Sequence, residues 1–177
     1  IRASHTLTFI AHKPGLLTAD GPDHCGEIRL AALEISPEAN HRPDARQLDT
    51  TAFSAYLQSR RQNCHKGSFG TAGILGGAPS MVGAAYLAGR AALKLGSGKV
   101  YLGLLDLAAP TVDTLQPELM QRKPRALLQT ELTALAIGPG LGISLEASEL
   151  VERAIALDQP LVLDADALNL IASEGNL

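Results

Sequence analysis

The sequence predicts an α/β protein whose larger part is built on a parallel β-sheet. From residue 66 onward, short apolar runs typical of buried strands alternate with longer segments of helical periodicity. Several of the apolar runs end in glycines or aspartates, as strands often do where the chain turns into a helix. Because strands joined by helices lie parallel in one sheet, this alternation predicts helices packed against a mostly parallel sheet.

The first 35 residues lack this alternation and have the composition of a β-hairpin. Residues 6–10 are rich in β-branched and aromatic side chains, and residues 26–35 form a second extended stretch. Turns are expected at residues 13–15 and 20–23, which contain proline and glycine. Two strands make an incomplete sheet, so we expect this segment to be the end of a larger one.

Residues 36–64 are expected to form a linker, because they are polar and contain Pro37 and Pro43. A helical turn is expected over residues 49–59, with Thr50 or Thr51 as its cap. The predicted organisation is a first domain remnant, a linker and a second domain, over residues 1–35, 36–64 and 65–177.

The second domain is expected to alternate strands with helices throughout. Strands are predicted over residues 72–75, 99–105, 132–137 and 160–163. Helices are predicted over residues 80–95 with Ser80 as the N-cap, over 145–157, and from Ala167 onward. A weaker helix is expected over residues 108–116, followed by a loop over residues 117–124.

Composition narrows the classes of function. The 177 residues carry a net charge of -3 and only 3% are aromatic, so nucleic acid is not an expected partner. We find no apolar run long enough to span a bilayer and no secretory leader, so no membrane association is expected. Cys25 and Cys64 are far apart and neither lies in a CxxC motif, which favours two reduced thiols and a cytoplasmic location.

Ligands of parallel sheets bind at the carboxyl ends of the strands. The first such end lies within residues 66–77, KGSFGTAGILGG, at the glycine pair that closes this stretch. A strand, a glycine turn and a helix start bring backbone N–H groups close to a phosphate. Lys66, Gly76 and Gly77 are therefore placed in the vicinity of a phosphate or nucleotide, although a solvated surface lysine explains Lys66 equally well. The stretch matches neither the Walker A nor the GxGxxG pattern.

Two further strand ends carry unusual residues. Residues 138–142, GPGLG, turn sharply and expose N–H groups that suit an anionic ligand, or else form a tight turn whose glycines take positive φ. Asp164 follows an apolar run, where its carboxylate would bind a hydroxyl group or hydrated Mg²⁺. Asp166 fits the N-cap of the next helix better than a catalytic role. The histidines lack the spacing of metal ligands, so no metal ligand is assigned.

Five motifs together resemble one family, the ADP- or ATP-dependent NAD(P)H-hydrate dehydratases. The motifs are HKGSFG, the Gly76 and Gly77 turn with Gly83 and Ala84 after it, LGSG, IGPGLG and LVLDADALN, in that order from His65 to Asn169. The resemblance implies a ribokinase-like three-layer sandwich with a mostly parallel sheet, of which this chain carries the N-terminal part. Residues 1–35 resemble the last strands of the NAD(P)H-hydrate epimerase domain that precedes the dehydratase in bifunctional members.

This resemblance implies a repair reaction on a small-molecule substrate. A nucleotide phosphorylates the hydroxyl group of hydrated NAD(P)H, and loss of phosphate restores the dihydronicotinamide ring. ADP or ATP and Mg²⁺ are the implied cofactors, and a homo-oligomer is the expected assembly. The positions implied to line the hydrate site are Gly83, Ala84, Gly138, Gly140, Gly142, Asp164 and Asn169.

The chain also departs from the family pattern. The family's Thr-Pro-His-Pro-Gly-Glu motif, its nucleotide-holding Lys-Gly segment and the catalytic aspartate of its Gly-Ser-Gly-Asp motif are expected beyond Leu177, and Ala78 stands where serine is frequent. We therefore expect no catalytic base within these residues and no turnover by the isolated polypeptide. Two alternatives remain open: a sugar or hydroxymethylpyrimidine-type kinase of the same fold, and a non-catalytic nucleotide-binding module.

Overall fold

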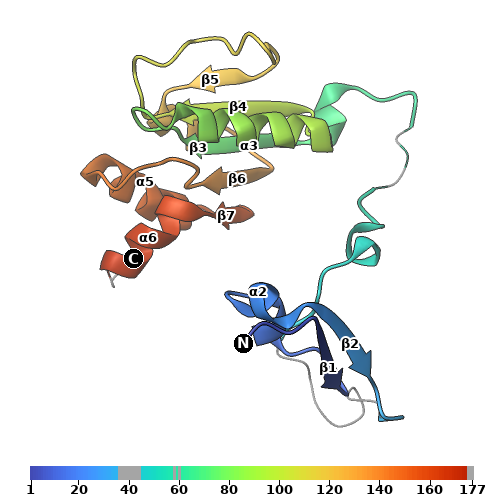
Figure 1. Cartoon of the computed structure of the whole chain (residues 1–177). Helices are drawn as coiled ribbons and strands as arrows, with labels where there is room; N and C mark the ends of the chain where they lie inside the picture. The colour runs from blue at the N-terminus through green and yellow to red at the C-terminus, as the bar shows by residue number, and fades with distance from the viewer. Residues whose placement is uncertain (36–44, 58, 60, 175–177) are drawn as a thin grey trace. The chain divides into compact units, whose positions relative to one another are not determined.

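A computed structural model describes residues 1–35, 45–57, 59 and 61–174 of the chain, which divides into two compact units, Ile1–Ser59 and Arg60–Leu177 (Figure 1). The expected linker over residues 36–64 lies partly outside the described residues. Among the described residues, no helix is both long and apolar enough to cross a lipid bilayer.

The first unit contains a parallel pair of strands, so the predicted hairpin is wrong. Strands β1 (His5–Phe9) and β2 (Glu27–Ala31) pair in parallel, with His5 opposite Glu27 and Phe9 opposite Ala31. The two expected turns are instead single-turn helices, α1 (Pro14–Leu17) and α2 (Gly21–Cys25), each with a proline in its first two positions. Proline fixes φ at a helical value without losing a needed hydrogen bond there, which explains why these stretches become helices.

A 3-10 helix over Thr50–Phe53 occupies the expected helical turn, but neither threonine is its N-cap. Asp49 is the N-cap, and its carboxylate accepts a hydrogen bond of 2.9 Å from the backbone N–H of Thr51. A hydrogen bond from the Thr51 hydroxyl group lowers the pKa of Asp49, and the backbone hydrogen bond lowers it further.

The second unit has the predicted parallel sheet, with five strands in the order β5-β4-β3-β6-β7 (Figure 1). The strands are β3 (Thr71–Gly76), β4 (Lys99–Leu104), β5 (Met120–Arg122), β6 (Ala134–Ile137) and β7 (Leu161–Leu163). Strand β5 lies in a segment predicted to be a loop. The helix predicted over residues 108–116 is absent, since this segment contains Pro110 and forms turns instead.

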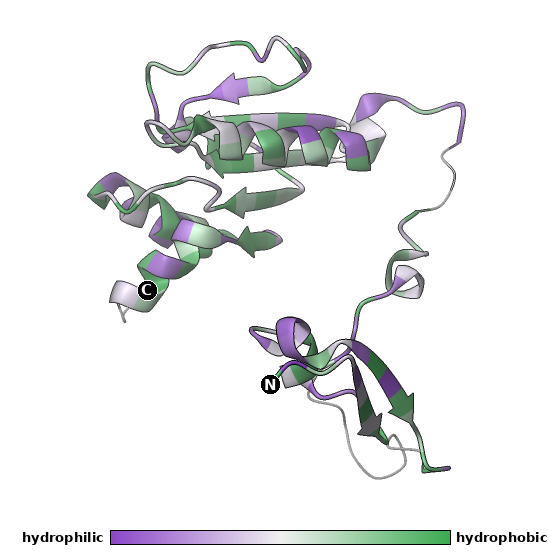
Figure 2. Ribbon diagram, in the orientation of Figure 1, coloured by the Kyte–Doolittle hydropathy of each residue, from purple (hydrophilic) through white to green (hydrophobic). Residues whose placement is uncertain are grey.

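Helices cover both faces of this sheet. Helix α3 (Val82–Leu95) packs on one face, where Ala85 shares a buried cluster with Val100 and Leu102 of β4. Helices α4 (Pro124–Leu127), α5 (Leu145–Ile155) and α6 (Ala165–Glu174) pack on the other face. Figure 2 shows the hydrophobic residues running along β6 and β7; Leu135 and Ile137 of β6 are buried, whereas Val162 of the edge strand β7 is 58% exposed.

The strand pairings place equivalent residues in rows across the sheet. Pairing connects Arg122 to Gly103, Gly103 to Leu75, Leu75 to Ile137 and Ile137 to Leu163. The next row along the chain direction contains Lys123, Leu104, Gly76, Gly138 and Asp164. All five strands therefore end at the same level, and the loops that follow them share the carboxyl edge of the sheet.

Helix α5 offers a matched test of this core. Leu150 is fully buried in the cluster under α4, α5 and α6, whereas Leu145 on the same helix is 79% exposed. Replacing Leu150 with alanine should lower the free energy of unfolding by about 2–5 kcal/mol, because the lost contacts leave a cavity. Replacing Leu145 with alanine should change it by less than about 0.5 kcal/mol. Urea denaturation measures both, and equal effects of the two variants would contradict the packing.

Candidate functional site

The loops after β3 and β6 are joined by hydrogen bonds at the carboxyl edge of the sheet. The backbone N–H of Gly77 donates to the carbonyl oxygen of Pro139 at 3.1 Å, and that of Ala78 donates to the carbonyl oxygen of Gly140 at 2.7 Å. These bonds continue the parallel pairing of β3 and β6 beyond the strands. The two amides are therefore not available to a phosphate, which corrects the role predicted for Gly77.

The glycines of these loops are required by the close approach of backbones. A Cβ at Gly76 would lie 2.2 Å from the Pro139 carbonyl oxygen, and one at Gly138 would lie 1.8 Å from the Asp164 carbonyl oxygen. Gly140 has φ of 58°, and a Cβ there would lie 2.6 Å from the Met81 carbonyl oxygen. Loop packing alone thus explains these three glycines, and exposure of N–H groups to a ligand is not needed to account for them.

Asp166 joins the start of α6, after β7, to the loop after β6. It is the second residue of α6 rather than its predicted N-cap, and its carboxylate accepts a hydrogen bond of 2.8 Å from the backbone N–H of Gly142. Ala165 before it has φ of 41°, a left-handed value that costs free energy for a residue other than glycine.

Asp164 presents its carboxylate to solvent at this edge. Its backbone N–H donates to Ile137, and no described residue donates a hydrogen bond to its side chain. Asn169 is also exposed and lies in the next turn of α6. No cluster of three or more His, Cys, Asp or Glu side chains able to hold a metal ion occurs among the described residues.

The start of α3 supplies open backbone donors at this edge. Among the described residues, nothing accepts a hydrogen bond from the backbone N–H of Val82 or Gly83. Gly83 is exposed, and a Cβ there would meet no atom within 4 Å. Helix N-termini carry a partial positive charge, so these two amides form an accessible donor pair for an anion.

Ala84 connects the start of α3 to the GPGLG loop, since its Cβ would lie 3.1 Å from a Cβ at Gly140.

The residue before the helix cap also differs from the prediction. Ser80 is not the N-cap, because its φ of 70° is left-handed and Met81 caps the helix without a side-chain hydrogen bond. The structure therefore brings Ala84 against Gly140 through a strained turn, with Gly83 exposed one residue earlier on the helix.

Lys66 lies at the opposite edge of the sheet, so it does not join Gly76 and Gly77. It opens a 3-10 helix over Lys66–Phe69, which pairs with the residues just before β4 through a 3.1 Å bond from Gly98 to Phe69. The length of β3 separates the two edges by about 17 Å, at about 3.3 Å per residue. The nucleotide role predicted for Lys66 is not supported by this geometry.

The loop after β4 borders the same carboxyl edge and was missed as a site element. The backbone N–H of Asp106 donates to the Gly77 carbonyl oxygen at 3.0 Å. The sequence pattern that could have identified Asp106 is the same as for Asp164: an aspartate directly after an apolar run. Farther along this loop, Asp113 is buried and accepts hydrogen bonds of 2.6 and 2.7 Å from Arg90 of α3, which hold the pKa of Asp113 below its usual value.

Tyr86 of α3 provides a second anchor for this loop. Its hydroxyl group donates to the Pro110 carbonyl oxygen at 2.7 Å and accepts from Gln121 of β5 at 2.7 Å. Burial raises the pKa of the Tyr86 hydroxyl. Together the two anchors fix the loop to the helix whose N-terminus faces the edge.

A hollow of about 360 Å³ lies at the other end of β6 and β7. It is formed by residues 128–132 and 157–159, and the side-chain amide nitrogen of Gln159 is buried without a partner among the described residues. None of the predicted site residues lines this hollow.

Comparisons with known proteins point to one family. The family model described as NAD(P)H-hydrate dehydratase matches residues 72–176. Two curated relatives are named bifunctional NAD(P)H-hydrate repair enzyme Nnr: the protein from Coxiella burnetii is 38% identical and that from Escherichia coli 36% identical, each over 97% of this chain. The chain spans only 37% and 34% of the length of these relatives.

Solved structures share the fold. The ADP/ATP-dependent NAD(P)H-hydrate dehydratase from Bacillus subtilis, co-crystallized with ATP/Mg²⁺, is 34% identical with a TM-score of 0.58 and covers 64% of this chain and 43% of that chain. A ribokinase-like superfamily protein from Enterococcus faecalis is 22% identical with a TM-score of 0.65, over 77% of this chain and 52% of that chain. The predicted ribokinase-like α/β fold is confirmed.

Alanine at Gly140 and alanine at Gly83 should have different effects on stability. Replacing Gly140 should lower the free energy of unfolding by more than about 1 kcal/mol, because its φ is left-handed and the new Cβ meets Met81. Replacing Gly83 should leave it unchanged or raise it by up to about 1 kcal/mol, since the site is open and alanine favours a helix. Thermal and urea unfolding measure both; a Gly83→Ala variant as unstable as Gly140→Ala would contradict the described loop.

The Arg90–Asp113 pair should make stability depend on acid pH. Because the folded pKa of Asp113 lies below its ordinary value of 3.8, the pair stabilises the fold fully above pH 3.8 and loses this contribution as the pH falls through the lower folded pKa. The difference in unfolding free energy between the wild type and Asp113→Asn should therefore be constant at higher pH and shrink below pH 3.8. Urea midpoints across this range measure it. A difference that grows on acidification would contradict the pairing.

Proposed function

Because this chain belongs to the family of NAD(P)H-hydrate dehydratases, we propose that its second unit supplies the hydrate-binding edge of an enzyme that uses ADP or ATP to dehydrate NAD(P)H hydrate. The match of the family model to residues 72–176 supports this proposal, since that range contains every loop of the carboxyl edge. The observation that carries it is the open pair of backbone donors at the start of α3, beside the GPGLG loop.

The donor pair suits the chemistry of the substrate. A reduced dinucleotide carries phosphates, which bind well to free N–H groups at a helix N-terminus. The absence of a side chain at Gly83 lets the ligand approach the helix backbone closely. The amides of Val82 and Gly83 would bind and orient a phosphate of the substrate or nucleotide, while the paired loops hold the helix start in place.

Asp164 carries a carboxylate at this edge that no described residue engages. In the proposed reaction the substrate hydroxyl group is phosphorylated, and loss of that phosphate restores the double bond of the ring. A carboxylate fits this step because it accepts a hydrogen bond from the hydroxyl group and orients it toward the nucleotide. Gly138 and Gly142 would shape the floor of this position, and Asn169 would lie beside it on α6.

Mg²⁺ fits this edge only as an ion shared with phosphates. Mg²⁺ prefers carboxylate oxygens and keeps several waters or phosphate oxygens. Asp164 provides one such oxygen donor, and the described residues offer no cluster that would form a complete protein cage. The ion would neutralise charge on the transferred phosphoryl group when the nucleotide is bound.

We further propose that residues 1–35 derive from an epimerase domain. The curated relatives that match 97% of this chain are named bifunctional repair enzymes, whereas the dehydratase model begins at residue 72. A parallel pair of strands joined by short helices is typical of the edge of a larger α/β sheet, which supports this assignment. A cytoplasmic location and a homo-oligomeric assembly remain predictions.

The direct test is an activity assay on the complete product of the gene that encodes this chain. Hydrated NADH, Mg²⁺ and either ADP or ATP are added, and the return of dihydronicotinamide absorbance is followed. Nucleotide-dependent recovery is the expected result. Consumption of nucleotide on a sugar or pyrimidine alcohol without recovery would overturn the proposal in favour of a kinase, and nucleotide binding without any chemistry would favour a binding module.

Replacing Asp164 with asparagine should reduce kcat/KM for hydrated NADH by about 10²-fold, the size of effect seen when one transition-state contact is removed. Asp158→Asn is the matched control, because Asp158 is also exposed but lies in the loop before β7, at the opposite edge. It should leave kcat/KM unchanged. Equal activity of Asp164→Asn and Asp158→Asn would remove Asp164 from the site.

A further inference from the structure

We propose that the ammonium group of Lys123 binds a phosphate of the dinucleotide, so that the substrate lies across the carboxyl edge of the sheet from β5 toward β6. This inference rests on the proposed function and adds the direction in which the substrate lies. The sequence did not indicate it, because residues 117–124 were predicted to be a loop and β5 was not recognised.

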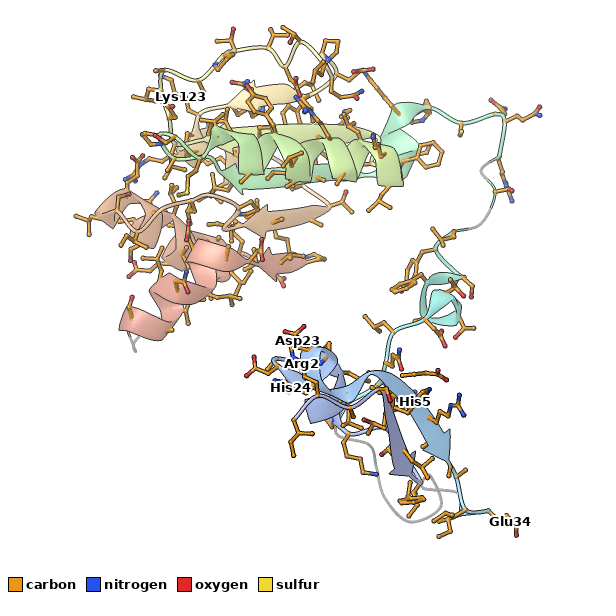
Figure 3. All side chains as sticks on the ribbon, viewed as in Figure 1. Arg2, His5, Asp23, His24, Glu34 and Lys123 are labelled. Carbon is orange, nitrogen blue, oxygen red and sulfur yellow. The ribbon has the colours of Figure 1, made fainter. Side chains whose placement is uncertain are left out.

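The strand pairings place Lys123 at the site edge. Arg122, the last residue of β5, pairs with Gly103 of β4, and Lys123 follows it directly. Lys123 therefore stands in the row that contains Leu104, Gly76, Gly138 and Asp164. Figure 3 shows Lys123 just beyond the end of β5, on the side of the sheet where the strands end.

Lys123 is also a cation without a competing partner in the part of the chain that the structure describes. Its side chain is exposed, and among the described residues nothing accepts a hydrogen bond or forms an ion pair with it. The neighbouring arginines are engaged: the Arg122 guanidinium lies 4.6 Å from the centre of the Tyr101 ring, and Arg125 pairs with Glu149 at 2.5 Å. Lys123 thus has its full charge available for a ligand.

The open amides of α3 lie between Lys123 and the GPGLG loop. A Cβ at Gly77 would lie 2.8 Å from a methyl carbon of Leu104 and 3.3 Å from the Cα of Val82, so the helix start stands over the ends of β3 and β4. Leu104 is the row neighbour of Lys123. Two sources of positive potential, a helix N-terminus and an ammonium group, therefore border the same part of the edge.

Two aspartates of this edge lie at the other end of the row, whereas Asp106 follows β4 and its carboxylate accepts a hydrogen bond of 2.9 Å from the backbone N–H of Ala108. Asp164 and Asp166 follow β7, on the far side of β3 and β6 from Lys123. Carboxylates repel phosphates, so the phosphates should face β5 and the uncharged hydrate ring should face β6 and β7.

The spacing allows this arrangement. Three strand spacings of about 4.8 Å separate Lys123 from Gly138, which is about 14 Å between backbones. The flexible four-carbon stem of the lysine shortens this gap, and the ribose between a phosphate and the nicotinamide ring fills much of the rest.

The test compares Lys123→Gln with Lys94→Gln in the complete gene product. Lys94 is also an exposed lysine, in the last turn of α3 toward the opposite edge of the sheet, so both variants remove one charge. Lys123→Gln should raise KM for hydrated NADH about 10-fold, because a hydrogen bond to a charged group is lost from substrate binding. Lys94→Gln should match the wild type, and Lys123→Arg should recover most of the affinity.

A phosphate-free substrate separates charge recognition from a general defect. With hydrated dihydronicotinamide riboside, Lys123→Gln and wild type should have the same KM. Equal KM values for hydrated NADH, or an equal loss with the riboside, would overturn the role of Lys123 while leaving the dehydratase proposal intact. If the wild-type gene product does not restore NADH at all, the proposed function fails and this inference fails with it.

Discussion

The two hydrogen bonds between the loops after β3 and β6 determine the shape of the candidate site. Gly77 and Ala78 donate to Pro139 and Gly140, so the two loops continue side by side where the strands have ended. Their closeness excludes a side chain at Gly76 and at Gly140. It also fixes the start of α3, because Met81 lies against Gly140, and the remaining features of the edge follow from that position.

The paired loops use most of their own polar groups, which decides what is left for a ligand. Gly142 is bound by the Asp166 carboxylate, and Asp106 closes the opposite flank by donating to Gly77. Open donors therefore include the first amides of α3 and the ammonium group of Lys123, as well as the first amides of α5 and α6, and Asp164 is an open carboxylate. Lys123 at the β5 end of the row and Asp164 at its β7 end give the site a direction as well as a location.

The sequence predicted the parallel sheet and its edge because apolar runs and glycine turns are local signals. The strands at 71–76, 99–104, 134–137 and 161–163 were found for this reason. Strand β5, Met-Gln-Arg, was missed because its place is set by pairing with β4 and not by its own composition. The first unit was predicted as a hairpin, since strand composition does not reveal direction. Ser80, Asp166 and Lys66 were misplaced because caps and edges depend on contacts distant in sequence.

Amide hydrogen exchange of the complete gene product, with and without hydrated NADH, tests the central claim that the substrate binds at the carboxyl edge. Binding should protect residues 80–84 and 138–142, which lie beside the open amides, while residues 66–70 and 98–99 at the opposite edge keep their exchange rates. Protection of residues 66–70 and 98–99 with none at residues 80–84 would place the ligand at the other end of the strands and contradict the account.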